Sequence, residues 1–506
     1  MKNSMRPSAR AVRRGISVLV LAAFAAAPCV AAPREQRQES TRSFDRTVSV
    51  MPAQALRVEH RHGDVRITTH ARSDLRVQAV IRVSADSERD AAQFLERVQI
   101  EMLDTPTAVT VRTIYPEHEW SRRNISYAVD YTLLMPEKMP LDVHNSFGSV
   151  AVSGAKAGIS VVNAHGTLTV ADITGRSRLE NSFAATEASR MNGDVTITGS
   201  NGDVSATTIA GALEVTCRFG RVAVGAVRGA ALVGNSNGQV EVADAASATI
   251  TNSFGAVTVR DVGTANISNS NGAVRVTGVR GPATVKTSFA PVTIATIAGA
   301  VDVTNSNGDV TLKDVSAAAD IRSSFGRIEV QGVKTGVRVT TGNSSVRVID
   351  VQGPVTVKTS FGLIAVERVR GAFTADNSNG GVEAADVRGA AQVNTSFGPV
   401  TLRDVEGAVN VRNQNGAVEV TPLAQAGRCH NITVETSFSP IRVHLPLAGY
   451  NVAARTSFGR IRTDVPITVT GSTGEGTLSG TIGAGGCSLQ LTNANGDIQI
   501  AGGAAQ

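Results

Sequence analysis

Hydrophobic and polar residues alternate over short segments that recur along most of the chain. Val257 and Val259 flank Thr258, and the same period of two resumes at Ala265 and Ile267. This period is typical of strands with one buried face. Asp and Gly residues interrupt the alternation between the two segments. Each unit is therefore predicted to contain two short strands and two turns.

The units repeat every 18 residues, a period typical of solenoids. One turn position alternates between Phe and Asn, which adds a second period of 36 residues. Beyond Asn415 the spacing of this Phe/Asn column becomes irregular, at Phe438, Phe458 and Asn495. Its regular members lie 17 or 18 residues apart: Phe147, His165, Phe183, Asn201, Phe219, Asn237, Phe254, Asn271, Phe289, Asn307, Phe325, Asn343, Phe361, Asn379, Phe397 and Asn415.

Identical short units of this kind satisfy their backbone hydrogen bonds by stacking in parallel. We therefore expect an all-β fold, a single-chain parallel β-solenoid (a right-handed β-helix) of ~18-residue coils. About 20 coils at a rise of ~4.8 Å would form a rod on the order of 95 Å long. Aromatic residues make up 4% of the chain, which fits a narrow interior filled by Val, Ala, Ile and Thr.

The two ends differ from the repeats. Residues 33–140 are predicted to form a small α+β N-terminal cap, with a helix over 87–98 that begins at the N-cap Ser87. The segment 57–69 already resembles a turn-and-strand unit. Residues 141–420 are predicted as the regular solenoid, and 421–506 as irregular C-terminal coils and a cap.

Residues 1–32 have the features of a signal peptide. A basic start is followed by a short apolar segment and then small residues, with cleavage expected after Ala31. Pro28 before Cys29 does not fit a lipidation motif. Without the five basic residues of this segment, the chain has 44 basic and 43 acidic residues. This balance argues against nucleic acid as a partner, and no later segment resembles a transmembrane helix.

Three cysteines remain after removal of the predicted signal. If coils stack in chain order, Cys429 and Cys487 lie about three coils apart, roughly 14 Å. A disulfide requires Cα atoms within ~7 Å. We therefore expect Cys217, Cys429 and Cys487 to be free, mostly buried thiols.

The order of segments resembles that of a known family. The helix SERDAAQFLERV precedes VDYTLLMP, which precedes serial NG-x-V and FG-x-V units. SPIRVHLP, ARTSFGRIRTD, LSGTIGAGG and NANGDIQI follow. This order, from about Phe44 to Ile500, is similar to that of the bacterial putative-adhesin family, exported β-solenoid domains of unknown function. The resemblance implies the solenoid fold and an adhesin-like role.

A column of aspartates is a candidate for chemistry. Each lies seven residues after a member of the Phe/Asn column, and Asp244 and Asp261 would be neighbours in adjacent coils. Such a pair could bind calcium or act in acid/base catalysis. Aspartate next to a turn more often satisfies backbone donors, which we favour. The column consists of Asp172, Asp244, Asp261, Asp314, Asp350, Asp386 and Asp404.

A pair of histidines is a second candidate. His60 and His62 lie on one face of a predicted strand and could bind a metal together with His70 or His118. No cysteine or acidic pair with ligand spacing accompanies them. Exposed strand histidines are therefore the favoured interpretation, and we expect no metal, cofactor or catalytic residue.

The phenylalanines of the Phe/Asn column allow two interpretations. Exposed rings would form a binding stripe for a glycan, a protein or a membrane-associated partner. Buried rings would fill the corner of each coil, with Asn between them to avoid overpacking. Buried rings are favoured because an exposed row would promote aggregation. The candidate stripe consists of Phe183, Phe219, Phe254, Phe289, Phe325, Phe361 and Phe397.

These observations predict a non-enzymatic exported solenoid with an adhesion, scaffold or envelope-interaction role. The alternatives are a carbohydrate-active β-helix enzyme, or an envelope protein that binds a lipid or small ligand. The expected location is the periplasm or cell surface of a Gram-negative bacterium, and the expected partner is an unidentified glycan or protein there.

Overall fold

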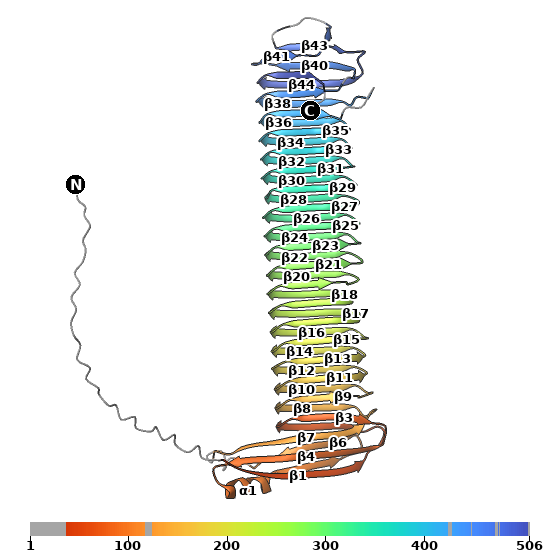
Figure 1. Ribbon diagram of the computed structural model, residues 1–506, viewed down its shortest axis with the longest axis vertical. Coiled ribbons are helices and arrows are strands. Elements are labelled where there is room, and N and C mark those ends of the chain that lie inside the picture. Colours follow the sequence, from red (N-terminus) through yellow and green to blue (C-terminus); the bar gives the residue numbers. More distant parts are fainter. Residues whose placement is uncertain are drawn as a thin grey trace, which may run out of the picture.

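The chain forms a straight rod of stacked coils with a small helix-containing base (Figure 1). The computed structural model describes residues 37–116, 124–423, 428–446, 448–470, 474 and 476–503. The predicted signal peptide at 1–32 and His118 lie outside these residues. The predicted parallel β-solenoid with an N-terminal α+β region is confirmed.

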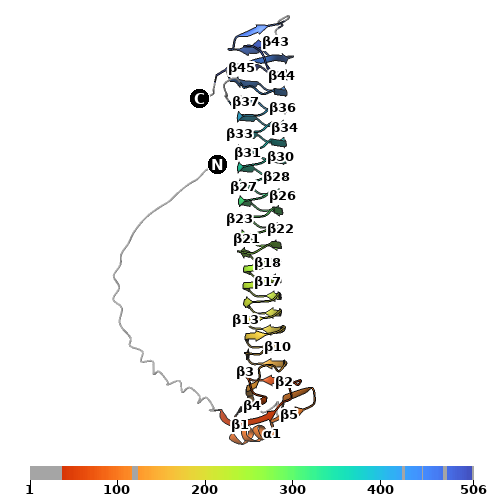
Figure 2. The same ribbon diagram turned by 90° about the vertical axis from the view of Figure 1, so that its right-hand side faces the viewer.

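Each regular coil contributes one strand to each of two opposed layers, which Figure 2 shows edge-on. The first layer consists of strands that end at the Phe/Asn column. They are β8 (Leu141–Phe147), β10 (Ile159–His165), β12 (Ser177–Phe183), β14 (Val195–Asn201), β16 (Leu213–Phe219), β20 (Ala265–Asn271), β22 (Ala283–Phe289), β24 (Val301–Asn307), β26 (Ala319–Phe325), β28 (Val337–Asn343), β30 (Val355–Phe361), β32 (Phe373–Asn379), β34 (Ala391–Phe397), β36 (Val409–Asn415) and β38 (Ile432–Phe438).

The second layer consists of the strands that follow each of these turns. They are β9 (Val150–Ser153), β11 (Leu168–Thr174), β13 (Thr186–Asn192), β15 (Val204–Ile209), β19 (Val257–Arg260), β21 (Val274–Val279), β23 (Val292–Ile297), β25 (Val310–Val315), β27 (Ile328–Val333), β29 (Val346–Val351), β31 (Ile364–Val369), β33 (Val382–Val387), β35 (Val400–Val405), β37 (Val418–Pro422) and β39 (Ile441–Leu445). The long strands β17 (Val222–Asn237) and β18 (Val240–Phe254) run through both layers.

The stacking register brings identical positions of successive coils together. Ile267 pairs with Ile250 in the coil below and with Val285 in the coil above, and all three side chains are fully or almost fully buried. The interior therefore consists of columns of small aliphatic residues between the two layers, where each added coil buries its apolar face against the previous one.

The aspartate column lies at an irregularity in the second layer. Asp172, Asp244, Asp261, Asp314, Asp350, Asp386 and Asp404 all have φ between 53° and 59°. The left-handed conformation suits Asp better than most residues. It shifts the alternation by one residue, so that Val257, Val259 and Val262 all point inward. The column therefore has a role in backbone conformation, at a bend within the second layer, and Asp172 and Asp350 pair with Arg side chains of the neighbouring coil.

The base of the rod seals the first coil. Strands β2 (Ala55–His62) and β3 (Val65–His70) form a coil that pairs in parallel with β8 and β9 above it. Below it, β6 (Ala108–Ile114) and β7 (Ser126–Pro136) continue the stack. Antiparallel pairs then end the stack: β5 (Gln99–Asp104) on β6, and β4 (Asp74–Ala85) between β7 and β1 (Gln38–Ser49).

Helix α1 (Glu88–Arg97) covers β1 and β4 at the base. It begins as predicted, because the Ser87 side chain accepts a hydrogen bond from the Asp90 N–H. Ala91, Phe94 and Leu95 form its buried face. Among the described residues, no helix is long and apolar enough to span a bilayer.

The C-terminal coils do not stack in chain order. Strands β44 (Cys487–Asn495) and β45 (Ile498–Gly502) pair directly with β38 and β39. Strands β40 (Tyr450–Thr456) and β41 (Ile461–Thr463), which precede them in the chain, lie on their other side. Two antiparallel strands, β43 (Thr477–Ile482) on β40 and β42 (Ile467–Val469) on β43, complete this end.

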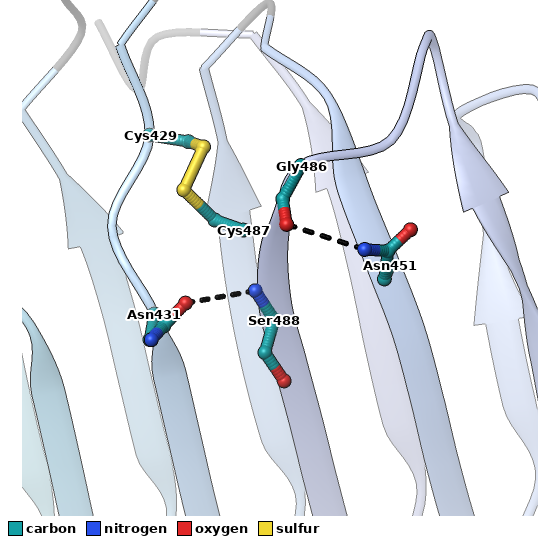
Figure 3. The surroundings of a disulfide bond; sticks show 6 residues. All are labelled: Cys429, Asn431, Asn451, Gly486, Cys487 and Ser488. Carbon is teal, nitrogen blue, oxygen red and sulfur yellow. Dashed lines mark hydrogen bonds between the residues drawn. A yellow bond between two sulfur atoms is a disulfide. The ribbon is translucent and has the colours of Figure 1, made fainter.

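This order overturns the prediction that Cys429 and Cys487 are free. They form a disulfide with a Cα–Cα distance of 5.8 Å (Figure 3). The prediction was wrong because it assumed stacking in chain order, whereas β44 lies directly on the coil that begins after Cys429. Beside the disulfide, the Ser488 N–H donates to Asn431 Oδ1 at 2.9 Å. Cys217 is a free, buried thiol, as predicted.

Candidate functional site

An exposed row of phenyl rings follows one edge of the rod. Ten rings of the Phe/Asn column are between 44% and 79% exposed. The interpretation of these rings as buried corners is therefore wrong. We call this row the phenyl stripe; it consists of the seven predicted residues, Phe183, Phe219, Phe254, Phe289, Phe325, Phe361 and Phe397, together with Phe147, Phe438 and Phe458.

The strand changes phase just before each ring. In β22, Ala283, Val285 and Thr287 point inward, and simple alternation would place Phe289 inward as well. The register pairs Thr287 and Phe289 with the coil above but leaves out Ser288 between them. The chain bends at this serine, and the ring faces solvent. Alternation alone could not predict this bend.

In many coils a buried Asn amide holds the bend, whereas in others, such as the coil of Phe289, Thr occupies the same position. Asn269, two residues before the column, donates from Nδ2 to the carbonyl of Gly272 at 2.7 Å and to that of Gly255 in the coil below at 3.1 Å. Gly272 has φ +138°, and a Cβ there would lie 2.1 Å from the Gly255 oxygen. Glycine at 272 avoids this clash, and the Asn269 amide ties this bend to the one in the coil below.

Phe and Asn alternate in the stack even where they do not alternate in the chain. Asn495 pairs with Phe438, and Gly459 lies over Gly496, so Phe458 follows Asn495 in space. The phenyl stripe therefore continues to the end of the rod with one Asn coil between rings, a ring spacing of ~9.6 Å. The irregular spacing in the sequence results from the exchanged order of the last coils.

The two margins of the stripe differ in charge. The residues that precede the column are mostly uncharged, whereas Asp and Arg recur in a fixed order two residues after it. Serine precedes most rings and most of the intervening Asn residues, and the charged residues at this position are Arg218 and, before His62 at the base, Arg61. Two residues after the column, three Asp–Arg steps occur, each with Asp in an Asn coil and Arg in the Phe coil above. In each step an Asp Oδ1 accepts the Arg backbone N–H. The steps are Asp203–Arg221, Asp309–Arg327 and Asp497–Arg460, with N–O distances of 2.8–2.9 Å.

Histidine replaces Asn at the base of the stripe. His62, Phe147, His165 and Phe183 form a continuous stack with centroid distances of 5.1, 4.7 and 4.6 Å and nearly parallel planes. His62 also contacts Tyr115 and Tyr127 edge-on. The stripe is thereby continuous with the aromatic residues of the base.

His60 is buried, not exposed as predicted. It is 7% exposed, its Nδ1 lies 3.2 Å from Thr113 Oγ1, and its ring contacts Tyr131 edge-on. Its Nε2 is buried without a hydrogen-bond partner. Burial lowers the pKa of His60 to about 4 and raises the pKa of Tyr131 to about 12. Among the described residues, no three His, Cys, Asp or Glu side chains form a metal-binding group.

An open groove follows the edge of the rod that carries the aspartate column. Its volume is about 810 Å³, and Asp244 and Asp261 line it together with Arg190, Arg228 and Arg280. Arg190 makes a bidentate pair with Asp172, which lowers the pKa of that carboxyl group. The predicted pair Asp244 and Asp261 thus shares one groove with cationic side chains.

No family model and no curated protein matches the chain. Among solved structures, it is similar to the crystal structure of a putative cell adhesion protein from Clostridium sporogenes. The two are 9% identical with a TM-score of 0.22, over 38% of this chain and 99% of the other. A TM-score this low carries no argument about fold or function.

Proposed function

We propose that this protein is an exported, non-enzymatic β-solenoid that mediates adhesion or scaffolding at the cell envelope through its phenyl stripe. The observation that carries the proposal is the exposure of ten rings in one column along the rod. Exposed apolar surface of this extent marks interaction sites, because leaving it in water is unfavourable. Each ring sits on a rigid, hydrogen-bonded turn, so binding requires little ordering.

The disulfide supports export. Disulfides persist in oxidising compartments such as the periplasm and the cell surface and are rare in the cytosol. Cys429 and Cys487 join two coils that are distant in the chain. The signal-like segment 1–32 and the disulfide therefore favour the same location, the periplasm or surface of a Gram-negative cell.

Protease treatment of intact cells tests the surface version of this proposal. We expect trypsin to remove the protein from intact cells, and purified protein to bind back to cells that lack it. Replacing Phe325 and Phe361 by Asn should reduce binding at least tenfold, since buried aromatic anchors dominate interface energies. Asn occurs naturally in this column, so the turn should be retained. Full protection from trypsin would contradict surface adhesion, and unchanged binding of the variant would contradict a role for the stripe.

We expect no cleavage when the purified protein is incubated with acidic polysaccharides, measured as new reducing ends or unsaturated products. The test is required because Asp244 and Asp261 share a groove with Arg228 and Arg280, and paired carboxylates can act as acid and base. Cleavage that disappears in the Asp244→Asn, Asp261→Asn variant would show that the protein is an enzyme.

A further inference from the structure

We propose that the partner of the phenyl stripe is the phenyl stripe of a second copy, bound antiparallel. The two-fold axis lies perpendicular to the rods, between the coil of Phe254 and the coil of Asn271. This inference rests on the proposed function, in that it names the partner of the same stripe. Three independent properties of the stripe lead to it: its periodicity, its charge pattern and its area.

The periodicity of the stripe matches that of a second copy. Rings recur every two coils, ~9.6 Å, along the whole rod. A partner that contacts many rings at once must have the same pitch, which an identical rod has by construction. With the two-fold axis in the position stated, Phe254 faces Asn271 of the second copy and Phe289 faces its Asn237. Each of the six rings from Phe147 to Phe325 thus enters the gap over an Asn, whereas Phe361 and Phe397 face the rings of His165 and His62 of the second copy.

A parallel pair lacks this fit. A two-fold axis along the rods would place every coil against its own copy, so that ring meets ring and amide meets amide. Shifting one rod by a coil restores the fit but makes the contact heterologous and open-ended. The strict alternation of large and small residues therefore favours the antiparallel pair.

The Asp–Arg steps select the same arrangement. All three run in the same direction along the rod, with Asp below Arg. In the antiparallel pair the second layers of both copies lie on the same side of the contact, so the steps adjoin in opposite directions. Asp203 then faces Arg327 of the second copy, and Arg221 faces its Asp309. Asp occurs in Asn coils and Arg in Phe coils, so opposite charges meet in the register that interleaves the rings.

The four charged side chains are available for this contact. All are exposed, although Arg221 also contacts Glu241 within the rod and Arg327 lies 4.0 Å from Glu329. Surface pairs of this kind are weak, and a guanidinium has donors for two partners. The serine column on the other margin carries almost no charge that would repel an identical surface.

The area is sufficient for a stable dimer. In this register, six rings of each copy, from Phe147 to Phe325, enter Asn gaps of the other copy. Each is about half exposed, which leaves about 100 Å² per ring. These six rings alone would bury about 600 Å² per copy and about 1,200 Å² in total, the lower end of the range for specific, stable interfaces. The antiparallel arrangement also places the two N-terminal bases at opposite ends.

Sedimentation equilibrium of the purified chain, with three stripe variants, tests the proposal. The wild type should form a dimer. Replacing Phe254 and Phe289 by Asn should raise the dissociation constant at least about a hundredfold, because each change removes two rings from the two-fold contact. Asn271→Phe should also abolish the dimer, although it adds apolar surface, because two rings would then compete for one gap.

The combined variant Phe254→Asn, Asn271→Phe should dimerise again, since each copy then offers an Asn where the other offers a ring. Circular dichroism of every variant confirms that the coil is intact. Stronger association of the Asn271→Phe variant would indicate non-specific hydrophobic association and would overturn the proposal. Failure of the combined variant to dimerise would also overturn it. A wild type that stays monomeric would also overturn it. Cell binding lost in the Phe325→Asn, Phe361→Asn variant would then still support the proposed function with another partner.

Discussion

Removing the Cys429–Cys487 disulfide should destabilise the C-terminal coils by about 4 kcal/mol. The two cysteines are separated by 58 residues, and closing a loop of this length in the unfolded chain accounts for the estimate. The loss should remain local, because each coil of a solenoid contacts only its neighbours. Strands β40 to β45 should therefore be affected, whereas β20 to β24 should not.

Hydrogen exchange measures this local effect. In the Cys429→Ser, Cys487→Ser variant, the amides of β44 should lose about a thousandfold in protection, the equivalent of about 4 kcal/mol. Adding a reductant to the wild type should reproduce the loss, and adding it to the variant should change nothing further, since Cys217 is already a free thiol. Equal protection of β44 in variant and wild type would show that the strand order alone holds this end.

Acid should weaken the base of the rod between pH 6.5 and 4. Burial lowers the pKa of His60 to about 4 from its ordinary value of 6.5. As the pH falls, the unfolded chain therefore binds a proton before the folded chain does, and stability decreases until the pH reaches about 4. The difference between the folded and unfolded pKa corresponds to about 3 kcal/mol of unfolding free energy. This stability is fully present above pH 6.5 and is lost as the pH falls to about 4. Burial also lowers the pKa of the nearby His62, which acts in the same direction.

The His60→Phe variant isolates this contribution. Phenylalanine can retain the edge-on contact with Tyr131 but cannot bind a proton. Hydrogen exchange of β2 and β7, corrected for its intrinsic pH dependence, should become less sensitive to acid in this range by about 3 kcal/mol. His144→Asn, a change at an exposed side chain, should retain the response of the wild type. An unchanged response in His60→Phe would assign the acid sensitivity to other groups.

The repeat could be predicted from the sequence because its signals are local. The 18-residue period, the N-cap at Ser87 and the aspartates near the second-layer turns depend on residues close together in the chain. Backbone conformation at these positions follows from side-chain chemistry, such as the tolerance of Asp for positive φ. The stacked solenoid is then the arrangement that satisfies identical short strands.

Two features depend on geometry that the hydrophobic pattern does not contain. The exposure of Phe289 depends on a bend at Ser288, which reverses the direction that alternation assigns to the ring. The disulfide depends on the exchanged order of the last coils. The sequence does contain a signal for that exchange. Asp497 lies two residues after Asn495, and Arg460 lies two residues after Phe458. The other Asp–Arg steps place the Asp coil directly below the Arg coil.

The alternation of rings and amides also sets the unit by which such a rod can grow. Duplicating a single 18-residue coil would place two rings, or two amides, in neighbouring coils. Every ring beyond that point would then be shifted by one coil relative to the original alternation. Duplicating two coils keeps the pattern and lengthens the rod by ~9.6 Å. Longer and shorter versions of this protein should therefore differ by multiples of 36 residues. Two rods of unequal length could then still interleave their rings along the full length of the shorter rod, because both have the same ring spacing.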